Sequence, residues 1–316
     1  MKQRTALLGL VSLVSVTGIL WHAVNFARAQ SQNSTPSTGL AISPPTFEVS
    51  GNGGDVIKNS VKLENMNPYP VEIAVDRRNF TAIGEEGAVG LTEEETSFSL
   101  ASWIEVTPSS VTIPAKTSQY FTFNIKVPLN AEPGGHFGSL VFRTIPSEKV
   151  EGSGASLAQE IGSLILLRIA GETVENATIE SFATSQKMYE FGPVNFEARI
   201  KNLGNVHTKP RGTIMITNLL GQNIDTISIE NKNVLPGAVR KLEGAWDTKW
   251  RLGHYTATFV AVFGDNTQRS AVTTFTIIPY RIVIAMLVLI ILISLIIKKH
   301  KKRITLAWKI LKSGKV

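Results

Sequence analysis

The chain has 316 residues, a formal net charge of +7 and no cysteine. The absence of cysteine excludes disulfides, thiolate nucleophiles, zinc held by cysteines and a lipid-modified cysteine. The basic residues before residue 30 and after residue 280 account for all of the positive charge and leave about −5 for residues 30–280, so we expect no nucleic-acid partner and assign the basic ends to the membrane.

The amino terminus reads as a signal peptide over residues 1–29. Lys2 and Arg4 precede an apolar run, and Ala27 and Ala29 occupy the small-residue positions of a cleavage site before Gln30. The alternative is an uncleaved first membrane span. In both cases the middle of the chain is exported. Residues 30–39 are rich in Ser, Thr, Asn and Gln, which is typical of a disordered spacer.

Alternating apolar residues predict a first β-sandwich over residues 40–171. The clearest strand is Tyr120–Val127, in which every second residue is apolar and bulky. The Gly- and Glu-rich segment Gly84–Ser97 is predicted to be an exposed loop or a short acidic ribbon. A calcium site is the weaker alternative, since the EF-hand spacing is missing. The segment Ser147–Ser156 predicts a long hairpin loop before the apolar strand Ile161–Ile169.

The second half repeats the first and predicts another sandwich over residues 174–278. An alternating strand ends in an Asn-rich turn at Asn65 and again at Asn202. Gly135-His136-Phe137 is echoed by Gly253-His254-Tyr255, and such a step resembles the tyrosine corner of immunoglobulin-like folds. The fold class is therefore all-β: two tandem immunoglobulin-like sandwiches followed by one carboxy-terminal transmembrane helix.

That helix is predicted over residues 279–297, because Ile282–Ile297 is apolar except for Ser294. Tyr280 and Arg281 would anchor it in the outer interface, and Lys298 and Lys299 begin a basic tail, residues 298–316, that the positive-inside rule places in the cytoplasm. The tail has apolar residues at helical spacing, so it either lies on the inner leaflet or acts as a plain stop-transfer cluster.

No pattern predicts an enzyme, a cofactor or a metal site. The exported histidines lack the spacing of metal ligands, and no nucleophile elbow, zinc-protease motif or phosphate loop is present. Trp103, Trp246 and Trp250 are the candidate binding residues, as aromatic faces that stack on sugars, although such residues more often fill a sandwich core.

Three segments carry a family resemblance: Ile42-Ser43-Pro44-Pro45, the stretch Thr107–Ala115, and the stretch Val127–Phe142 with Pro133-Gly134-Gly135-His136-Phe137. Together they resemble the first domain of the WxL-interacting cell-surface proteins of Gram-positive and related bacteria. The resemblance implies a leader, a second sandwich, a single span, peptidoglycan binding by the first domain and protein binding by the second. Residues 174–278 are only generically immunoglobulin-like.

These observations favour a non-catalytic protein of the bacterial cell membrane, with its amino-terminal region outside, that holds peptidoglycan or a secreted surface protein near the bilayer. The alternative is an assembly factor resembling pilus chaperones, which offers an exposed strand edge to an extended client. A hydrolase is the third hypothesis and would require acidic or histidine residues clustered in a cleft.

Overall fold

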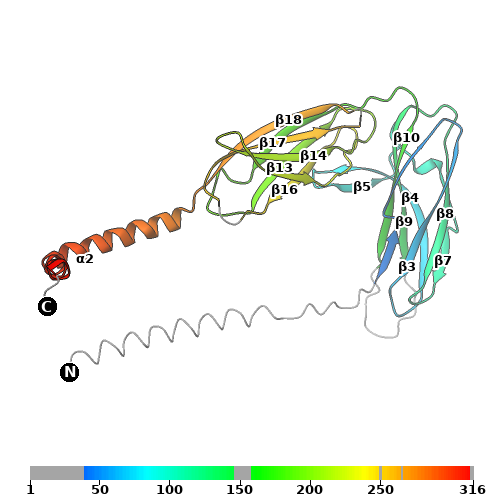
Figure 1. The fold of residues 1–316 in the computed structure, drawn as a ribbon. Coiled ribbons are helices and arrows are strands. Elements are labelled where there is room, and N and C mark those ends of the chain that lie inside the picture. Colours follow the sequence, from blue (N-terminus) through cyan, green and yellow to red (C-terminus); the bar gives the residue numbers. More distant parts are fainter. Residues whose placement is uncertain (1–38, 146–157, 249–250, 265, 314–316) are drawn as a thin grey trace.

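The structure is a computed structural model that describes residues 39–145, 158–248, 251–264 and 266–313. The predicted signal peptide, nearly all of the predicted spacer and the predicted hairpin loop Ser147–Ser156 lie outside the described residues. The described part is built from two β-sandwiches and one long helix, so the predicted all-β class is confirmed. Figure 1 shows the sandwiches set across one another in an L.

The first sandwich packs the sheet β1-β3-β8-β6 against the sheet β2-β10-β9-β4-β5, in which β7 also pairs with β4. The first strand crosses between these sheets at Ser43-Pro44-Pro45, so β1 pairs with β3 and β2 pairs with β10. The strands are β1 (Leu40–Ser43), β2 (Thr46–Gly51), β3 (Val56–Asn65), β4 (Val71–Ile83), β5 (Ala88–Thr92), β6 (Ile104–Thr107), β7 (Ser110–Ile113), β8 (Ser118–Lys126), β9 (Gly134–Ile145) and β10 (Glu160–Ile169).

The second sandwich packs the sheet β11-β13-β16 against the sheet β12-β18-β17-β14-β15. The strands are β11 (Ala177–Thr184), β12 (Met188–Tyr189), β13 (Val194–Asn202), β14 (Arg211–Asn218), β15 (Asn223–Ile229), β16 (Val239–Trp246), β17 (Gly253–Val262) and β18 (Gln268–Ile277).

Alternation along the strands sets the cores. Phe121, Phe123 and Ile125 of β8 are fully buried, while the residues between them face outward, as the predicted strand requires. β10 is apolar in nearly every position because both of its faces are covered. Ile165 and Leu167 face the core, whereas Leu164 and Leu166 lie on the opposite face, against the second sandwich.

The duplication is visible in two equivalent asparagines. Asn65 and Asn202 are both buried. Asn65 is the last residue of β3, and Asn202 is the last residue of β13. The Asn65 amide donates to the carbonyls of Tyr69, Ile113 and Pro114. The Asn202 amide donates to those of Val206 and Val234, at 2.7 and 2.8 Å. Each therefore ties a turn to a distant segment of its own sandwich.

The tyrosine corner expected at Tyr255 is present. Its hydroxyl donates to the Leu252 carbonyl three residues upstream, at 3.3 Å. The equivalent Phe137 has no hydroxyl and instead packs outward, toward the second sandwich. The two repeats thus keep the same strand start and use its aromatic residue differently.

The helix α2 (Tyr280–Ser313) leaves the far end of the second sandwich. Its segment Tyr280–Lys299 is apolar enough to cross a membrane and lies entirely outside the protein core. The predicted span ends at residue 297, whereas the helix continues through the basic segment to Ser313, since lysine and arginine are good helix formers. Arg281 is paired with Glu190 at 3.3 Å, so the start of α2 is tied to the second sandwich.

Candidate functional site

The tryptophans chosen as binding candidates do not form a common surface. Trp246 is 3% exposed in the second core, and its indole N–H donates to Asp225 at 2.8 Å. It therefore has no face for stacking on a sugar, and that prediction is wrong for this residue. Trp103 is half-buried against the first core, with its ring 4.5 Å from that of His136. Trp250 lies outside the described residues.

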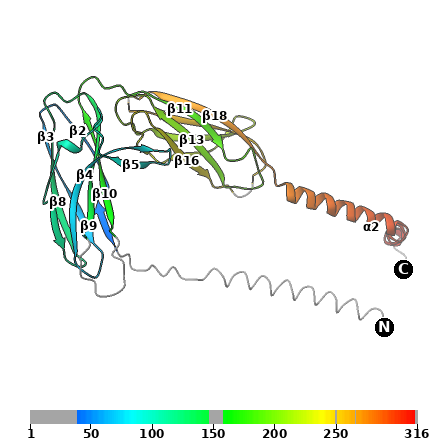
Figure 2. The same cartoon turned by 180° about the vertical axis from the view of Figure 1, so that it is seen from behind.

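Of the two predictions for this segment, loop or short acidic ribbon, the structure has the ribbon, a β4–β5 arm. β4 and β5 extend beyond the first sandwich, and their turn docks on the second (Figures 1 and 2). Arg199 donates to Glu85 through two nitrogens, and the Lys241 ammonium lies 2.5 Å from Glu86. The backbone N–H of Lys241 also donates to the backbone carbonyl of Glu85 at 2.8 Å. We call these contacts of Glu85 and Glu86 with Arg199 and Lys241 the interdomain clasp.

The arm is closed by a glycine that no other residue replaces easily. Gly87 has φ +88°, a left-handed backbone conformation that favours glycine. A Cβ there would first meet the Arg240 guanidinium, which is the end of a flexible side chain and can move aside. The prediction of a solvated acidic face at Gly84–Ser97 is therefore wrong for Glu85 and Glu86, which pair with the second sandwich.

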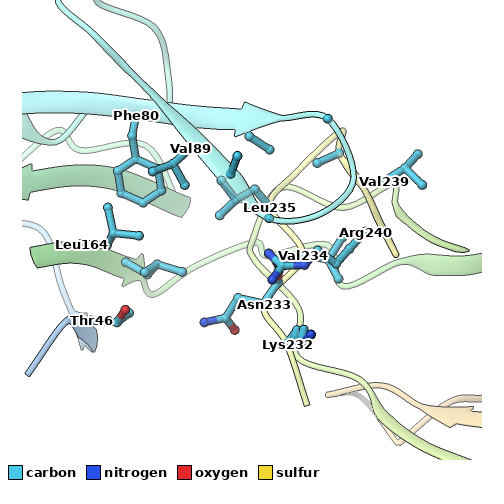
Figure 3. A pocket seen from close by; sticks show the side chains of 16 residues that line it. Thr46, Phe80, Val89, Leu164, Lys232, Asn233, Val234, Leu235, Val239 and Arg240 are labelled. Atoms are coloured by element: carbon cyan, nitrogen blue, oxygen red, sulfur yellow. Dashed lines mark hydrogen bonds between the residues drawn. The ribbon is translucent and has the colours of Figure 1, made fainter. Parts of the chain in front are cut away.

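An apolar cluster lies beneath the arm. Phe80, Phe137 and Leu166 of the first sandwich are buried together, and Leu235 of the second packs on them. A cavity of about 230 Å³ remains between the sandwiches. It is lined by residues of β2, β4, β5 and β10 and by the segment Lys232–Arg240 (Figure 3). Apolar contacts and the clasp together hold the two sandwiches in one arrangement.

A second set of polar contacts joins the sandwiches at β2. Glu48 accepts from Lys209 at 2.9 Å and from the Asn233 amide at 2.7 Å. The hydrogen bonds from Asn233 and Lys209 lower the pKa of Glu48 from its ordinary value of 4.5. Gly135 N–H donates to the Asn205 carbonyl at 2.8 Å. The interface is therefore polar at its rim and apolar at its centre, as in other stable interfaces.

We expect His207 to make this interface sensitive to acid. Its ring packs edge-on against Phe137, 6.1 Å between centroids, and burial lowers the pKa of His207 below its ordinary 6.5. Glu48, Arg168, Lys209 and Glu175 are the charged groups around it. Because an imidazole in water takes up a proton more readily than this buried one, acid favours the separated sandwiches. The docked arrangement is fully favoured above about pH 6.5 and weakens as the pH falls below it.

We expect fluorescence energy transfer between dyes on the two sandwiches to show more separated molecules at pH 5 than at pH 7.5. His207→Gln, which stays neutral, should remove most of this difference. An unchanged pH response in the variant would assign the effect to another group.

β10 pairs with β9 along one edge, and only half of its other edge is paired. On that other edge Leu164–Ile169 pair with β2, whereas no strand among the described residues pairs with Glu160–Ser163. Leu164 N–H donates to the Pro45 carbonyl on this side. Since backbone groups alternate along a strand, the N–H and C=O of Glu160 and Gly162 point to the same, unpaired edge. A hollow of about 330 Å³ lies beside them, between β10 and Leu40 of β1.

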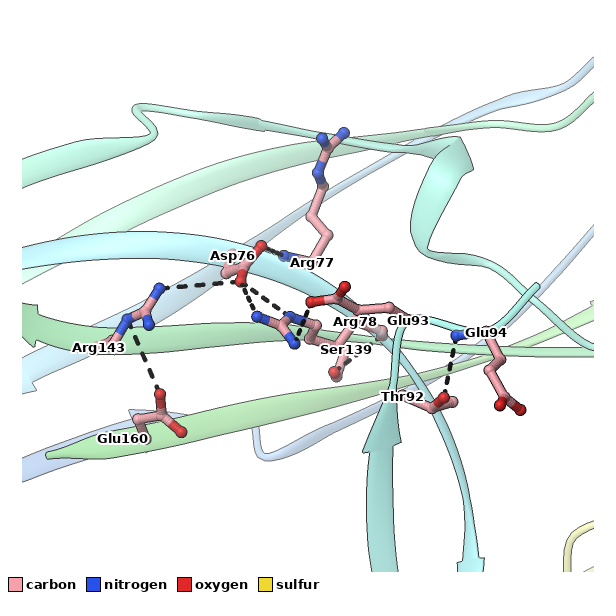
Figure 4. Close-up of polar contacts among 9 residues, drawn as sticks. All are labelled: Asp76, Arg77, Arg78, Thr92, Glu93, Glu94, Ser139, Arg143 and Glu160. Carbon is pink, nitrogen blue, oxygen red and sulfur yellow. Dashed lines mark hydrogen bonds and ion pairs between the residues drawn. The ribbon is translucent and has the colours of Figure 1, made fainter.

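A charged network borders this free edge on the outer face of the sheet (Figure 4). Arg143 of β9 lies 3.9 Å from Glu160 and 4.0 Å from Asp76, and Arg78 binds both Asp76 and Glu93. Burial would raise the pKa of Asp76, but the hydrogen bonds from Arg78 and from the Arg77 N–H outweigh it and hold the pKa below 3.8. The outer face of the sheet beside Glu160–Ser163 thus carries a row of ion-paired side chains, which we call the charged ladder.

Among the described residues, no three side chains of His, Asp or Glu are grouped so that they would hold a metal ion. The ionised groups beside β10 are all committed to ion pairs. The arrangement is suited to binding an extended chain through backbone hydrogen bonds and charges. Sequence reasoning missed this edge, although the paired prolines Pro44-Pro45 mark the point where the first strand leaves it.

No family model matches the chain, and no curated protein matches it. Solved structures of low similarity include the class 5 fimbriae chaperone CfaA, 13% identical over 75% of this chain and 99% of that one, with a TM-score of 0.41. The Pseudomonas aeruginosa CupB2 chaperone is 9% identical over 74% and 100%, with a TM-score of 0.35. The periplasmic chaperone SfaE is 13% identical over 76% and 100%, with a TM-score of 0.34.

Proposed function

We propose that this chain is a membrane-anchored, non-enzymatic assembly or holding factor that binds an extended segment of a protein client at the free edge of β10. The observation that carries the proposal is the unpaired edge of β10 at Glu160–Ser163, directly before Leu164–Ile169, which pair with β2. An extended peptide that lies along this edge gains backbone hydrogen bonds from Glu160 and Gly162. Side chains of Arg143 and Glu160 on the sheet face then add selectivity by charge.

The anchor is part of the proposal. α2 is apolar over Tyr280–Lys299 and is followed by basic residues, so we place it across the bacterial cell membrane with its basic end in the cytoplasm. Tyr280 and Arg281 lie at its outer end, and Lys298 and Lys299 at its inner end. The two sandwiches then face the outside of the membrane, where clients are secreted or assembled.

Binding of peptidoglycan is the second candidate, and the resemblance to the WxL-interacting proteins implies it. The observation that favours it is the open charged ladder around Asp76 and Arg143, because wall polymers carry both carboxylate and amine groups. Binding of a polymer on this face requires the charges and not the strand edge. The two candidates therefore separate in an experiment.

The test uses two substitutions at one position. Gly162→Pro removes the outward N–H without removing a bond to β9, whereas Gly162→Ala keeps it. A Cβ at Gly162 would approach the Leu140 carbonyl oxygen at 3.5 Å and nothing closer, so the alanine side chain fits. Peptides selected from a random library on the full chain in nanodiscs serve as probes. We expect Gly162→Pro to weaken their binding about tenfold, since one hydrogen bond is lost, and Gly162→Ala to leave it almost unchanged.

Equal binding by the two variants would exclude strand addition at β10. In a parallel arm, sedimentation of the full chain with insoluble peptidoglycan is compared for Gly162→Pro and Arg143→Glu. Loss of sedimentation in Arg143→Glu alone would favour the wall polymer as ligand. Protection of the Glu160 and Gly162 amides from hydrogen exchange by a selected peptide would support strand addition directly.

A further inference from the structure

The end of the second sandwich from which α2 departs carries large apolar side chains in water. Leu219 and Leu220, in the turn between β14 and β15, are 79% and 80% exposed, and Leu252, just before β17, is 70% exposed. Met188 of β12 is 56% exposed. We call these four residues the apolar tip. Single exposed leucines are common, but an adjacent pair joined by two further apolar residues at one end of a domain marks an interaction surface.

The strand register places the apolar tip level with the start of α2. Asn218 lies opposite Tyr255, and Tyr255 lies opposite Phe275, so Leu219 and Leu220 reach the level of Thr276 and Ile277. The turn that holds them lies two strands from β18, about 10 Å across the sheet.

The other two residues of the apolar tip lie at the same level. Leu252 directly precedes Gly253, which pairs with Ile277, and Met188 pairs with Thr276. α2 begins only three residues after Ile277. The apolar tip therefore surrounds the point at which the chain leaves the sandwich.

Charges at this end fit a lipid surface. Lys187 and Arg251 are exposed beside the apolar tip, and Arg281 is 76% exposed at the start of α2. The acidic Glu190 pairs with Arg281, Asp225 accepts from Trp246, and Asp247 is exposed. Leucines flanked by lysine and arginine are typical of segments that enter the interface between headgroups and acyl chains.

We infer that the apolar tip inserts into the outer interface of the bilayer that α2 crosses, so that the second sandwich is seated on the membrane and not merely tethered to it. The inference rests on the proposed membrane anchor, and the lipid surface is the partner because α2 brings these leucines to it. Seating at several points, spread over the sheet around the helix, fixes the tilt of the sandwich. The helix with its single ion pair, Arg281 to Glu190, constrains that tilt less.

Fluorescent labelling at single cysteines tests this inference, because the chain has no cysteine of its own. The full chain, in nanodiscs of phosphatidylcholine and phosphatidylglycerol, is labelled with the environment-sensitive dye NBD at Leu220→Cys, Leu252→Cys or Leu129→Cys. Leu129 is the control, since it is 89% exposed in the first sandwich. With spin-labelled lipid as quencher, we expect the dyes at positions 220 and 252 to lose roughly half of their fluorescence, and the dye at position 129 to lose almost none.

A fourth label, at Ile290→Cys within α2, separates the possible failures. Quenching at position 290 without quenching at positions 220 and 252 would overturn the seating of the sandwich and leave the anchor intact. No quenching at position 290 would overturn the anchor and the seating together. In the variant Leu219→Asp, Leu220→Asp, the dye at position 252 should lose most of its quenching; unchanged quenching there would show that these leucines do not seat the domain. Peptide binding at β10 is measured separately and is affected by none of these results.

Discussion

Asn202→Ala should unfold the second sandwich at markedly lower denaturant than the native chain while leaving the first sandwich nearly unaffected. The substitution leaves the Val206 carbonyl buried without its donor and removes the acceptor of the Gly204 N–H. The Val234 carbonyl loses one of two donors and keeps the Thr208 N–H. Each buried group left unpaired costs about 1–3 kcal/mol, so we expect a loss of about 3 kcal/mol in the free energy of unfolding. Hydrogen exchange followed by mass spectrometry measures each sandwich separately.

Asn218→Ala is the matched control, since it removes an asparagine from a turn of the same sandwich that water reaches. Its side chain accepts from the N–H groups of Leu220 and Gln222, and water replaces it at little cost. Asn65→Ala should have the reciprocal effect and lower protection in the first sandwich alone. Equal effects of Asn202→Ala and Asn218→Ala would contradict the structural role assigned to the buried amide.

Reversing the two acidic charges of the interdomain clasp should release the L arrangement. In Glu85→Lys, Glu86→Lys, two lysines meet Arg199 and Lys241, and like charges in contact oppose docking. We expect the distribution of distances between spin labels on the two sandwiches, at Tyr120→Cys and Met215→Cys, to become about twofold broader, because the like charges remove the preference for one arrangement. Pulsed electron resonance measures this distribution.

The control for the clasp carries the same change in net charge elsewhere. Glu64 and Glu105 form exposed ion pairs with Lys62 and Lys126 on the other sheet of the first sandwich. Glu64→Lys, Glu105→Lys should leave the distance distribution narrow. If both double variants broaden it, net charge and not the clasp controls the arrangement.

Strands were predictable from the sequence where one face of the sheet is exposed to solvent and the other is buried. In β8 the alternation of apolar and polar residues predicted both the strand and its buried face, because successive side chains of a strand point to opposite faces of the sheet. The tyrosine corner at Tyr255 was predictable for a similar reason, since its hydroxyl bonds a carbonyl only three residues away. A contact can be predicted from the local sequence when both of its residues lie close together in the chain.

The arm and the free edge depend on distant partners, so the sequence does not reveal them. Glu85 meets Arg199 across 114 residues, and nothing near Glu85 distinguishes a docked acidic turn from a solvated one. The free half of β10 is defined by the place where β2 stops pairing with it, which is a property of another strand. Trp246 likewise reads as a surface candidate beside Asp247 and proves to be core, because alternation in β16 turns it inward.

Under the proposed function, the height of the second sandwich sets how far from the bilayer a client is held. β17 and β18 each have ten residues, so the second sandwich is about 33 Å tall at 3.3 Å per residue. A client anchored in the same membrane needs a stalk of at least roughly ten extended residues to reach that height. A fixed stand-off of this kind would discriminate between clients by stalk length before any side chain is compared.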